Sequence, residues 1–172
     1  PENPNGYQTA YLWEKVLQKD TLMDILQRFI NLEVKYEKDE NGKQVEKQTM
    51  IFPRYHQLDV VRKLVADTTA KGSGQHYLIQ HSAGSGKSNS IAWLAYHLQK
   101  VHDGANNPIF NSVIIVTDRT VLDRQLQNTI ISFDATTGLV ETIGDNKSSK
   151  DLLKAINDGK QITFPKEENF GL

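Results

Sequence analysis

The chain has 172 residues, 38% of them hydrophobic, which is enough for one ordinary globular domain and an additional segment. Its 20 basic and 21 acidic residues leave a formal charge of −1, which excludes a basic surface spread over the whole chain and restricts any contact with nucleic acid to a local site. The absence of cysteine excludes disulfides and thiolate metal sites and favours a reducing compartment, the cytoplasm. No apolar run approaches the ~18 residues of a membrane-spanning helix, so we expect no membrane contact.

The first thirty residues predict a small helical segment. Residues 1–6 carry neither an initiator methionine nor the pattern of a signal peptide, so we expect an internal piece of a longer protein. Between residues 11 and 30, apolar residues recur at steps of three and four, with an interruption at Lys19-Asp20-Thr21. This pattern predicts two short helices, the second capped by Asp20 or Thr21.

Residues 31–37 and 44–51 predict a polar, exposed β-hairpin, because they flank Asn41-Gly42, a dipeptide typical of tight turns. Glu33-Val34-Lys35 in the first strand resembles half of a metal-dependent nuclease site, in which a carboxylate binds Mg²⁺ and a lysine polarises the phosphate. The charges alternate along this strand and no aspartate-bearing strand precedes it, so we interpret them as a solvated face. The five histidines show no metal-ligand spacing either.

Helix and strand patterns alternate after Pro53. In order, they predict helix 55–70, strand 76–80, helix 88–101, strand 112–117, helix 120–132, a short strand 139–143 and helix 150–158. Residues 159–172 show no clear element. This order predicts an α/β fold with a parallel sheet and right-handed crossovers. We therefore divide the chain into residues 1–51, a helical linker with a hairpin, and an α/β domain at residues 52–172.

A phosphate-binding loop is predicted by the eight residues between strand 76–80 and helix 88–101, His81-Ser82-Ala83-Gly84-Ser85-Gly86-Lys87-Ser88. Gly84 and Gly86 allow backbone N–H groups to turn toward a phosphate, and Lys87 can reach the β- and γ-oxygens. The Ser88 hydroxyl can hold Mg²⁺ at a helix N-terminus, whose dipole favours an anion. The general phosphate-loop pattern has glycine at the position of His81. The prediction therefore depends on the G-x-G-K-S motif and on its position after a predicted strand and before a predicted helix. The alternative is a glycine-rich turn capped by Ser88.

A candidate base-reading residue, Gln57, precedes Lys87 by thirty positions and follows Phe52-Pro53-Arg54. A glutamine amide donates and accepts hydrogen bonds at once, which matches the N6/N7 edge of adenine, and the plane of Arg54 can stack on the base. A lone glutamine at a helix start is also common as a polar surface residue. Its place before a phosphate loop favours adenine recognition.

The strand that ends in Thr117-Asp118-Arg119 is a candidate DNA contact. Asp118 has the position of the Mg²⁺-organising acid of P-loop enzymes, but that acid is usually followed by glutamate where water is activated, and here Arg119 follows. Thr117 and Arg119 suit contacts with phosphodiesters. The alternative is that Asp118 and Arg119 only cap the strand and pair locally.

Four stretches together, residues 7–30, 52–57, 80–88 and 117–125, resemble the restriction (R) subunit of type I restriction-modification enzymes. Those subunits are similar to superfamily 2 helicases, in which two RecA-like domains hydrolyse ATP to move double-stranded DNA and an N-terminal nuclease domain cuts it. The resemblance implies that residues 52–172 are the first part of a RecA-like P-loop domain. It also implies ATP and Mg²⁺ as cofactors, with double-stranded DNA and the methylation and specificity subunits as partners.

The resemblance assigns roles to the candidate residues. It makes Lys87 catalytic, Arg54, Gln57 and residues 82–88 the ATP-binding set, Ser88 the Mg²⁺ ligand, and Thr117 and Arg119 part of a DNA surface. The sequence contains no DEAD-type acidic box and no arginine finger of a second motor domain. We therefore expect the full-length parent protein to be an ATP-dependent endonuclease, and this piece of it to be inactive by itself. The alternatives are another superfamily 2 helicase or translocase and a non-catalytic interaction module anchored by a nucleotide.

Overall fold

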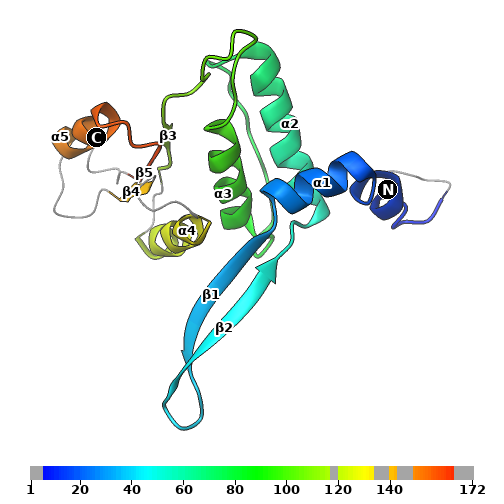
Figure 1. Cartoon of the computed structure of the whole chain (residues 1–172), viewed down its shortest axis with the longest axis vertical. Coiled ribbons are helices and arrows are strands. Elements are labelled where there is room, and N and C mark those ends of the chain that lie inside the picture. The colour runs from blue at the N-terminus through cyan, green and yellow to red at the C-terminus, as the bar shows by residue number, and fades with distance from the viewer. Residues whose placement is uncertain (1–5, 117–119, 134–139, 143–148, 165–172) are drawn as a thin grey trace. The chain divides into compact units, whose positions relative to one another are not determined.

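A computed structural model describes residues 6–116, 120–133, 140–142 and 149–164 (Figure 1). The chain divides into two compact units, Pro1–Leu58 and Asp59–Leu172, which we call the N-terminal and C-terminal units. In the described part of the chain, no helix is both long enough and apolar enough to cross a bilayer.

The N-terminal unit begins with the two short helices that the apolar spacing predicts, the π-helix η1 (Leu12–Val16) and α1 (Lys19–Arg28). Ile25 and Phe29, one helical turn apart, are fully buried. The predicted cap of the second helix is wrong, because α1 begins at Lys19 and Gln18 occupies the N-cap position. Asp20 instead lies in the first turn, where its charge complements the helix dipole, and Thr21 is buried.

The predicted hairpin is confirmed: β1 (Asn31–Lys38) pairs antiparallel with β2 (Gln44–Ile51). Its turn is closed by Asp39, whose Oδ1 accepts hydrogen bonds from the N–H groups of Asn41 at 2.9 Å and Lys43 at 2.8 Å. Gly42 takes a φ of 77°, a left-handed conformation that glycine adopts without strain. Both strands are exposed along nearly their whole length.

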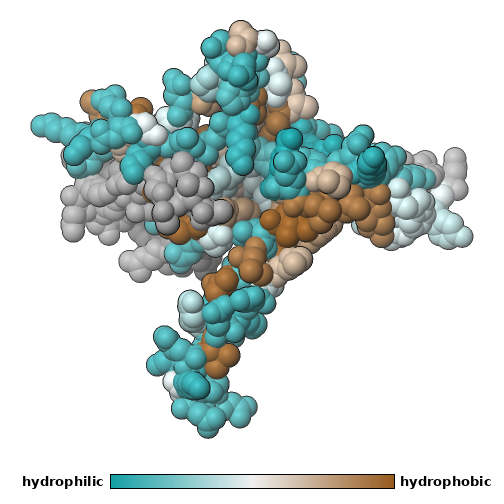
Figure 2. Space-filling model, in the orientation of Figure 1, coloured by the Kyte–Doolittle hydropathy of each residue, from teal (hydrophilic) through white to brown (hydrophobic). Residues whose placement is uncertain are grey.

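The two faces of this hairpin differ, which the prediction of a polar hairpin missed. On one face, Glu33 pairs with Lys35 at 2.8 Å and Glu37 with Lys47 at 3.1 Å. These ion pairs agree with a solvated face. The other face carries exposed hydrophobic side chains, visible as brown atoms along the hairpin and beside α1 in Figure 2. On this face of the hairpin, Leu32, Val34 and Met50 are exposed, and so is the ring of Tyr36.

Helix α2 (Tyr55–Lys71) follows Pro53 as predicted and is shared by the two units. It ends at Gly72, which has a φ of 77° and donates its N–H to the carbonyl of Thr68 at 2.8 Å. This glycine stop matches the Lys71-Gly72 signal in the sequence.

The C-terminal unit contains a three-stranded parallel sheet in the order β3-β5-β4. The strands are β3 (Val113–Ile114), β4 (Val140–Thr142) and β5 (Ile162–Phe164). The helices of this unit besides α2 are α3 (Lys87–Leu98), α4 (Thr120–Ser132) and α5 (Ser149–Asn157). Its core gathers α3, α4 and the sheet around the buried residues Ala92, Ala95, Ile115, Leu126, Ile130 and Ile162. The parallel sheet agrees with the predicted α/β order.

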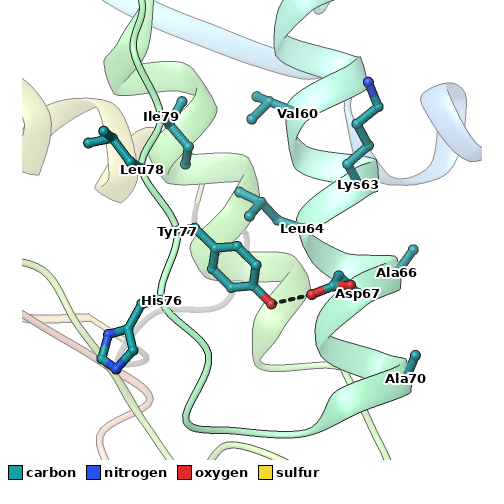
Figure 3. Close-up of a pocket in the computed structure, with 10 residues that line it drawn as sticks. All are labelled: Val60, Lys63, Leu64, Ala66, Asp67, Ala70, His76, Tyr77, Leu78 and Ile79. Carbon is teal, nitrogen blue, oxygen red and sulfur yellow. Dashed lines mark hydrogen bonds between the residues drawn. The ribbon is translucent and has the colours of Figure 1, made fainter.

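Two predictions about this unit are wrong. Strand β5 lies in the stretch that showed no clear element, although it is the central strand and Ile162 is fully buried. Residues 76–80, predicted as a strand, form no strand in the structure and run beside α2 (Figure 3). Leu78 in this segment is 95% exposed. A strand needs a neighbouring strand for its hydrogen bonds, and none of the described residues supplies one here.

Candidate nucleotide-binding site

The predicted phosphate loop leads directly into the first turn of α3. Gly84 has a φ of 71° and Gly86 a φ of 82°, both left-handed, and Gly86 is the N-cap of α3. The Ser85 N–H donates to the Ser82 carbonyl at 3.3 Å and closes the loop. The space beside Gly84 is open, because a β-carbon there would have no neighbouring atom within 4 Å. The loop therefore leaves room for a ligand against its backbone.

The start of α3 provides donors for an anion. Lys87 and Ser88 are the first residues of the helix, where backbone N–H groups have no acceptor within the helix itself. The N–H groups of Asn89 and Ser90 both donate to the Gly86 carbonyl, at 3.1 and 3.3 Å. The partial positive charge of the helix N-terminus adds to these donors and favours a phosphate.

The Lys87 side chain folds back onto the loop. Its Nζ donates to the carbonyl oxygens of Ser82 at 2.9 Å and His81 at 3.3 Å. These acceptors are neutral, whereas a phosphate oxygen is charged and forms hydrogen bonds about twice as strong. Because the lysine side chain is exposed and long, it can exchange these carbonyls for a phosphate. The residues present therefore fit the phosphates of a nucleotide.

The fit to Mg²⁺ depends on Ser88, which is half-buried at the second position of α3. In the part of the chain that the structure describes, no three His, Cys, Asp or Glu side chains come together to hold a metal ion. Mg²⁺ is commonly bound through few protein ligands, substrate phosphates and water. Ser88 beside the phosphate loop suits that kind of site.

Gln57 is 2% exposed, and its Oε1 accepts a hydrogen bond from the Arg54 N–H at 2.8 Å. The Gln57 N–H donates back to the Arg54 carbonyl at 2.9 Å. The glutamine side chain at N3 reaches back to the N–H of the N-cap residue of α2, which is one half of a capping box, and a backbone hydrogen bond closes the same turn. A carbonyl-type oxygen has two lone pairs, so Oε1 can hold the cap and still accept from adenine N6. The structure thus gives Gln57 a structural role that the sequence did not reveal.

The predicted DNA contacts, Thr117 and Arg119, lie outside the described residues, and so does Asp118. The chain before them belongs to the sheet, since the Ile115 N–H donates to the Thr163 carbonyl at 3.0 Å. The chain after them is α4, which begins at Thr120 as the sequence predicts.

Two hollows between α2 and the segment before the loop involve residues that sequence reasoning missed. A groove of ≈ 830 Å³ lies between α2 and residues 76–79 (Figure 3). Across it, the Tyr77 hydroxyl donates to Asp67 Oδ2 at 2.8 Å, and Lys71 Nζ lies 2.7 Å from Asp67 Oδ1. The hydrogen bond from Lys71, and next that from Tyr77, hold the pKa of Asp67 below its ordinary value. No sequence pattern indicates this cluster, because Tyr77 and Asp67 meet only through the fold.

The second hollow is a cavity of ≈ 290 Å³ that shares Lys87 and His81 with the loop. The other lining residues come from α2, α3 and the segment before the loop, and they are Val60, Val61, Leu64, Ile79, Ser90, Ile91 and Leu94. The phosphate loop is thus backed by an apolar space rather than by a filled core.

The sequence profile of the SWI2/SNF2 ATPases matches residues 56–170, the stretch that contains the loop, the sheet and helices α3 to α5. The chain belongs to the SWI2/SNF2 ATPase family. Its membership agrees with a glycine-rich loop before α3 whose lysine can reach a phosphate.

The chain is also similar to the "Type I restriction enzyme HindI endonuclease subunit" of Haemophilus influenzae, with 27% identity over 160 residues. The similarity covers 91% of this chain and 14% of the relative, so the chain spans about one seventh of the relative's length. This finding confirms the resemblance that the four sequence stretches indicated. No solved structure matches the chain at a significant level.

Proposed function

We propose that this SWI2/SNF2 ATPase segment is the ATP-binding part of the motor subunit of a type I restriction endonuclease, which couples ATP hydrolysis to translocation and cleavage of double-stranded DNA. The observation that carries the proposal is the Lys87 ammonium, held 2.9 Å from a loop carbonyl at the N-terminus of α3 and ready to exchange it for a phosphate. Residues 52–172 would form the first part of a RecA-like domain, and residues 1–51 the linker that leads into it.

Each residue of the site has one task in this proposal. The loop from Ser82 through Ala83, Gly84, Ser85 and Gly86 would surround the phosphates with backbone N–H groups. Lys87 would place its charge on the β- and γ-oxygens, and Ser88 would hold Mg²⁺, which neutralises charge that develops on the phosphates. Gln57 would read adenine beside the plane of Arg54.

DNA would be held at the end of the strand that precedes α4. Thr117 and Arg119 have the side chains for contacts with phosphodiesters, which position DNA without reading its sequence. The residues that activate water and complete the transition state would come from other parts of the motor, so the 172-residue chain alone would bind ATP without turning it over.

The similarity to the HindI subunit favours a restriction motor over another translocase of the family. It covers 91% of the chain, whereas the family profile begins at His56, so the similarity must reach well into the first 55 residues. The sequence before the ATPase region is therefore shared with the restriction subunit as well. The alternative is a translocase that works without restriction partners.

The experiment that separates these functions is purification of the protein with its methylation and specificity subunits, followed by an ATPase assay on DNA. A restriction motor should form a stable complex with both subunits and hydrolyse ATP only on DNA with an unmethylated target for that complex. If any DNA stimulates hydrolysis equally without those subunits, the protein is another translocase. If the protein binds no nucleotide in either state, it is an interaction module.

A further inference from the structure

The hairpin has a free edge along β1. In the part of the chain that the structure describes, β1 pairs with β2 and with no other strand. Every second residue of an edge strand points its backbone N–H and C=O away from the sheet, so the edge can pair with a further strand. Figure 1 shows the hairpin extending away from α1, and β1 is exposed from Val34 to its end at Lys38. A hairpin without a further strand is marginally stable in water.

The side chains of β1 sort by face into two kinds. Hydrophobic side chains lie on one face: Leu32, Val34 and Tyr36. Charged side chains lie on the other face, in alternating order of sign: Glu33, Lys35 and Glu37. The exposed fractions of the hydrophobic residues range from 41% for Val34 to 67% for Tyr36. A strand that fits this edge should therefore be hydrophobic on one face and carry the complementary charges on the other.

A second copy of β1 meets both requirements when it runs antiparallel with Val34 opposite Val34. On the hydrophobic face of this register, Leu32 lies opposite Tyr36 of the second copy, and Tyr36 opposite its Leu32. On the charged face, Glu33 lies opposite Lys35 of the second copy, and Lys35 opposite its Glu33. Because the arrangement is symmetric, every favourable pair occurs twice.

The hairpin itself favours a further carboxylate beside Lys35. Within one hairpin, Glu33 Oε2 lies 2.8 Å from Lys35 Nζ, two residues along the same strand. Lys35 also lies directly opposite Lys47 of β2, and like charges in this position repel. Glu33 of the second copy would approach Lys35 from the free edge and offset this repulsion.

Other registers and the edge of β2 fit less well. The register with Lys35 opposite itself places like charges opposite each other. The register with Tyr36 opposite itself pairs less of β1 and places Val34 opposite a lysine. On β2 the charged residues are Glu46 and Lys47, which are adjacent and therefore lie on opposite faces. They cannot pair across two antiparallel copies of β2, so complementarity favours the edge of β1.

We propose that the free edge of β1 is a dimer interface, at which a second copy of this chain adds its own β1 antiparallel, with Val34 at the two-fold axis, to form a four-stranded sheet. The same surface is used by both copies, as a two-fold interface requires. A single pair of short strands buries less than about 1,200 Å², so the dimer should be weak, with a Kd of about 10–100 μM. This dimer is independent of the proposed nucleotide site.

Exchange of the two charges tests the register in the purified protein by analytical ultracentrifugation. Glu33→Lys gives each copy lysine at both positions, and Lys35→Glu gives each copy glutamate at both. Each variant alone should raise the dimer Kd about tenfold. An equal mixture of the two should form heterodimers about as tightly as the wild type, because opposite charges face each other again. Glu46→Lys is the matched control, since it changes the charge of β2 by the same amount and should leave the Kd within about twofold.

Engineered cysteines test the position of the two-fold axis, and the chain has no cysteine of its own. Val34→Cys places two thiols opposite each other, with about 5 Å between the Cα atoms, a distance that a disulfide spans. A mild oxidant should therefore cross-link this variant readily. In Tyr36→Cys the two thiols are about 13 Å apart, so cross-linking should be at least about tenfold slower.

Three results would each disprove the dimer interface. They are a wild-type protein that stays monomeric at about 0.5 mM, a mixture of the two charge variants that associates no better than each variant alone, and cross-linking of Tyr36→Cys as fast as that of Val34→Cys. The binding of an ATP analogue, measured on the same samples, tests the nucleotide site separately. Loss of analogue binding with an intact dimer would count against the proposed function alone.

Discussion

The Nζ atom of Lys87 lies 2.9 Å from the carbonyl oxygen of Ser82, five residues earlier in the same loop. This hydrogen bond keeps the ammonium over the loop, at the N-terminus of α3, where the first backbone N–H groups of the helix lie. A phosphate that binds there needs to displace only a neutral acceptor to obtain the charge of Lys87. The loop can therefore hold its geometry before nucleotide binds, which lowers the cost of ordering on binding.

Even a methyl side chain at Gly86 should disturb the loop. Its φ of 82° is left-handed, so Gly86→Ala should destabilise the protein by about 1–2 kcal/mol and weaken the binding of an ATP analogue. Gly104→Ala is the control, since a β-carbon there has open space and Gly104 has no left-handed φ. Chemical denaturation and analogue titration measure both effects. Equal behaviour of the two variants would show that the loop does not hold the conformation seen here.

Two substitutions of Gln57 should separate its capping role from adenine recognition. Gln57→Ala loses the hydrogen bond to the Arg54 N–H and should cost about 1 kcal/mol of stability, as well as narrowing the preference for ATP over GTP. Gln57→Glu keeps an acceptor for the cap but cannot donate to adenine N7. It should still lose the ATP preference while keeping the cap, although a carboxylate at a 2% exposed position lowers the stability by itself. If Gln57→Glu keeps the full preference, Gln57 is only a helix cap.

The Tyr77–Asp67–Lys71 cluster should give a stability that depends on pH. Because the folded state lowers the pKa of Asp67, its contribution is complete above the ordinary carboxyl pKa and is lost as the pH falls through the folded pKa, below about pH 4. Lys71 has a raised pKa, so its contribution is lost only in strong alkali. Asp67→Asn should lower the Tm at pH 7 and have a smaller effect in acid. A Tm difference that is the same at both pH values would contradict this assignment.

Tyr77→Phe tests whether the same cluster holds residues 76–80 beside α2. The variant loses the 2.8 Å hydrogen bond to Asp67 and leaves the ring in place. The amide protons of residues 76–80 should then exchange faster with solvent, since these residues belong to no strand that would protect them. Hydrogen exchange measured by mass spectrometry would show this. Unchanged exchange would mean that other contacts hold the segment.

Local signals were enough to predict the hairpin from its turn, α2 from its glycine stop and α4 from its apolar spacing. Each of these signals lies within a short stretch of consecutive residues. The phosphate loop was predicted for the same reason, because G-x-G-K-S is contiguous. Strand β5 was missed because three residues between Gly159 and Pro165 carry no period, and its burial comes from β3 and β4 on either side.

At residues 76–80 the error is the opposite one, because a strand was predicted where none forms. An apolar run can satisfy the pattern of a strand, but pairing depends on residues elsewhere in the chain, and the described part pairs none with it. The cavity behind the loop was equally beyond prediction, because Val60 and Leu94 come from different helices. The buried cap role of Gln57 could have been inferred, since Arg54 and Gln57 have the spacing of a capping box.

Arg119→Ala should weaken DNA binding and leave nucleotide affinity near normal. A single phosphate contact contributes to affinity on every DNA sequence alike, so the salt slope of DNA affinity should fall in magnitude by about one charge. Arg28→Ala is the control, because Arg28 pairs with Asp24 on the surface of α1, at 3.3 Å. Binding titrations at several salt concentrations measure the slope. Loss of ATP affinity with DNA affinity intact would place Arg119 in the nucleotide site instead.

The sharpest test of the nucleotide site is the rate of DNA-stimulated ATP hydrolysis by Lys87→Ala in the complete motor protein. In the proposed site Lys87 would bring its positive charge to the β- and γ-phosphates, so the substitution should abolish hydrolysis while the protein stays folded. Lys100→Ala, an exposed lysine just past the other end of α3, should keep the wild-type rate. A well-folded Lys87→Ala protein that turns over ATP at the wild-type rate would contradict the assignment of this loop to the motor.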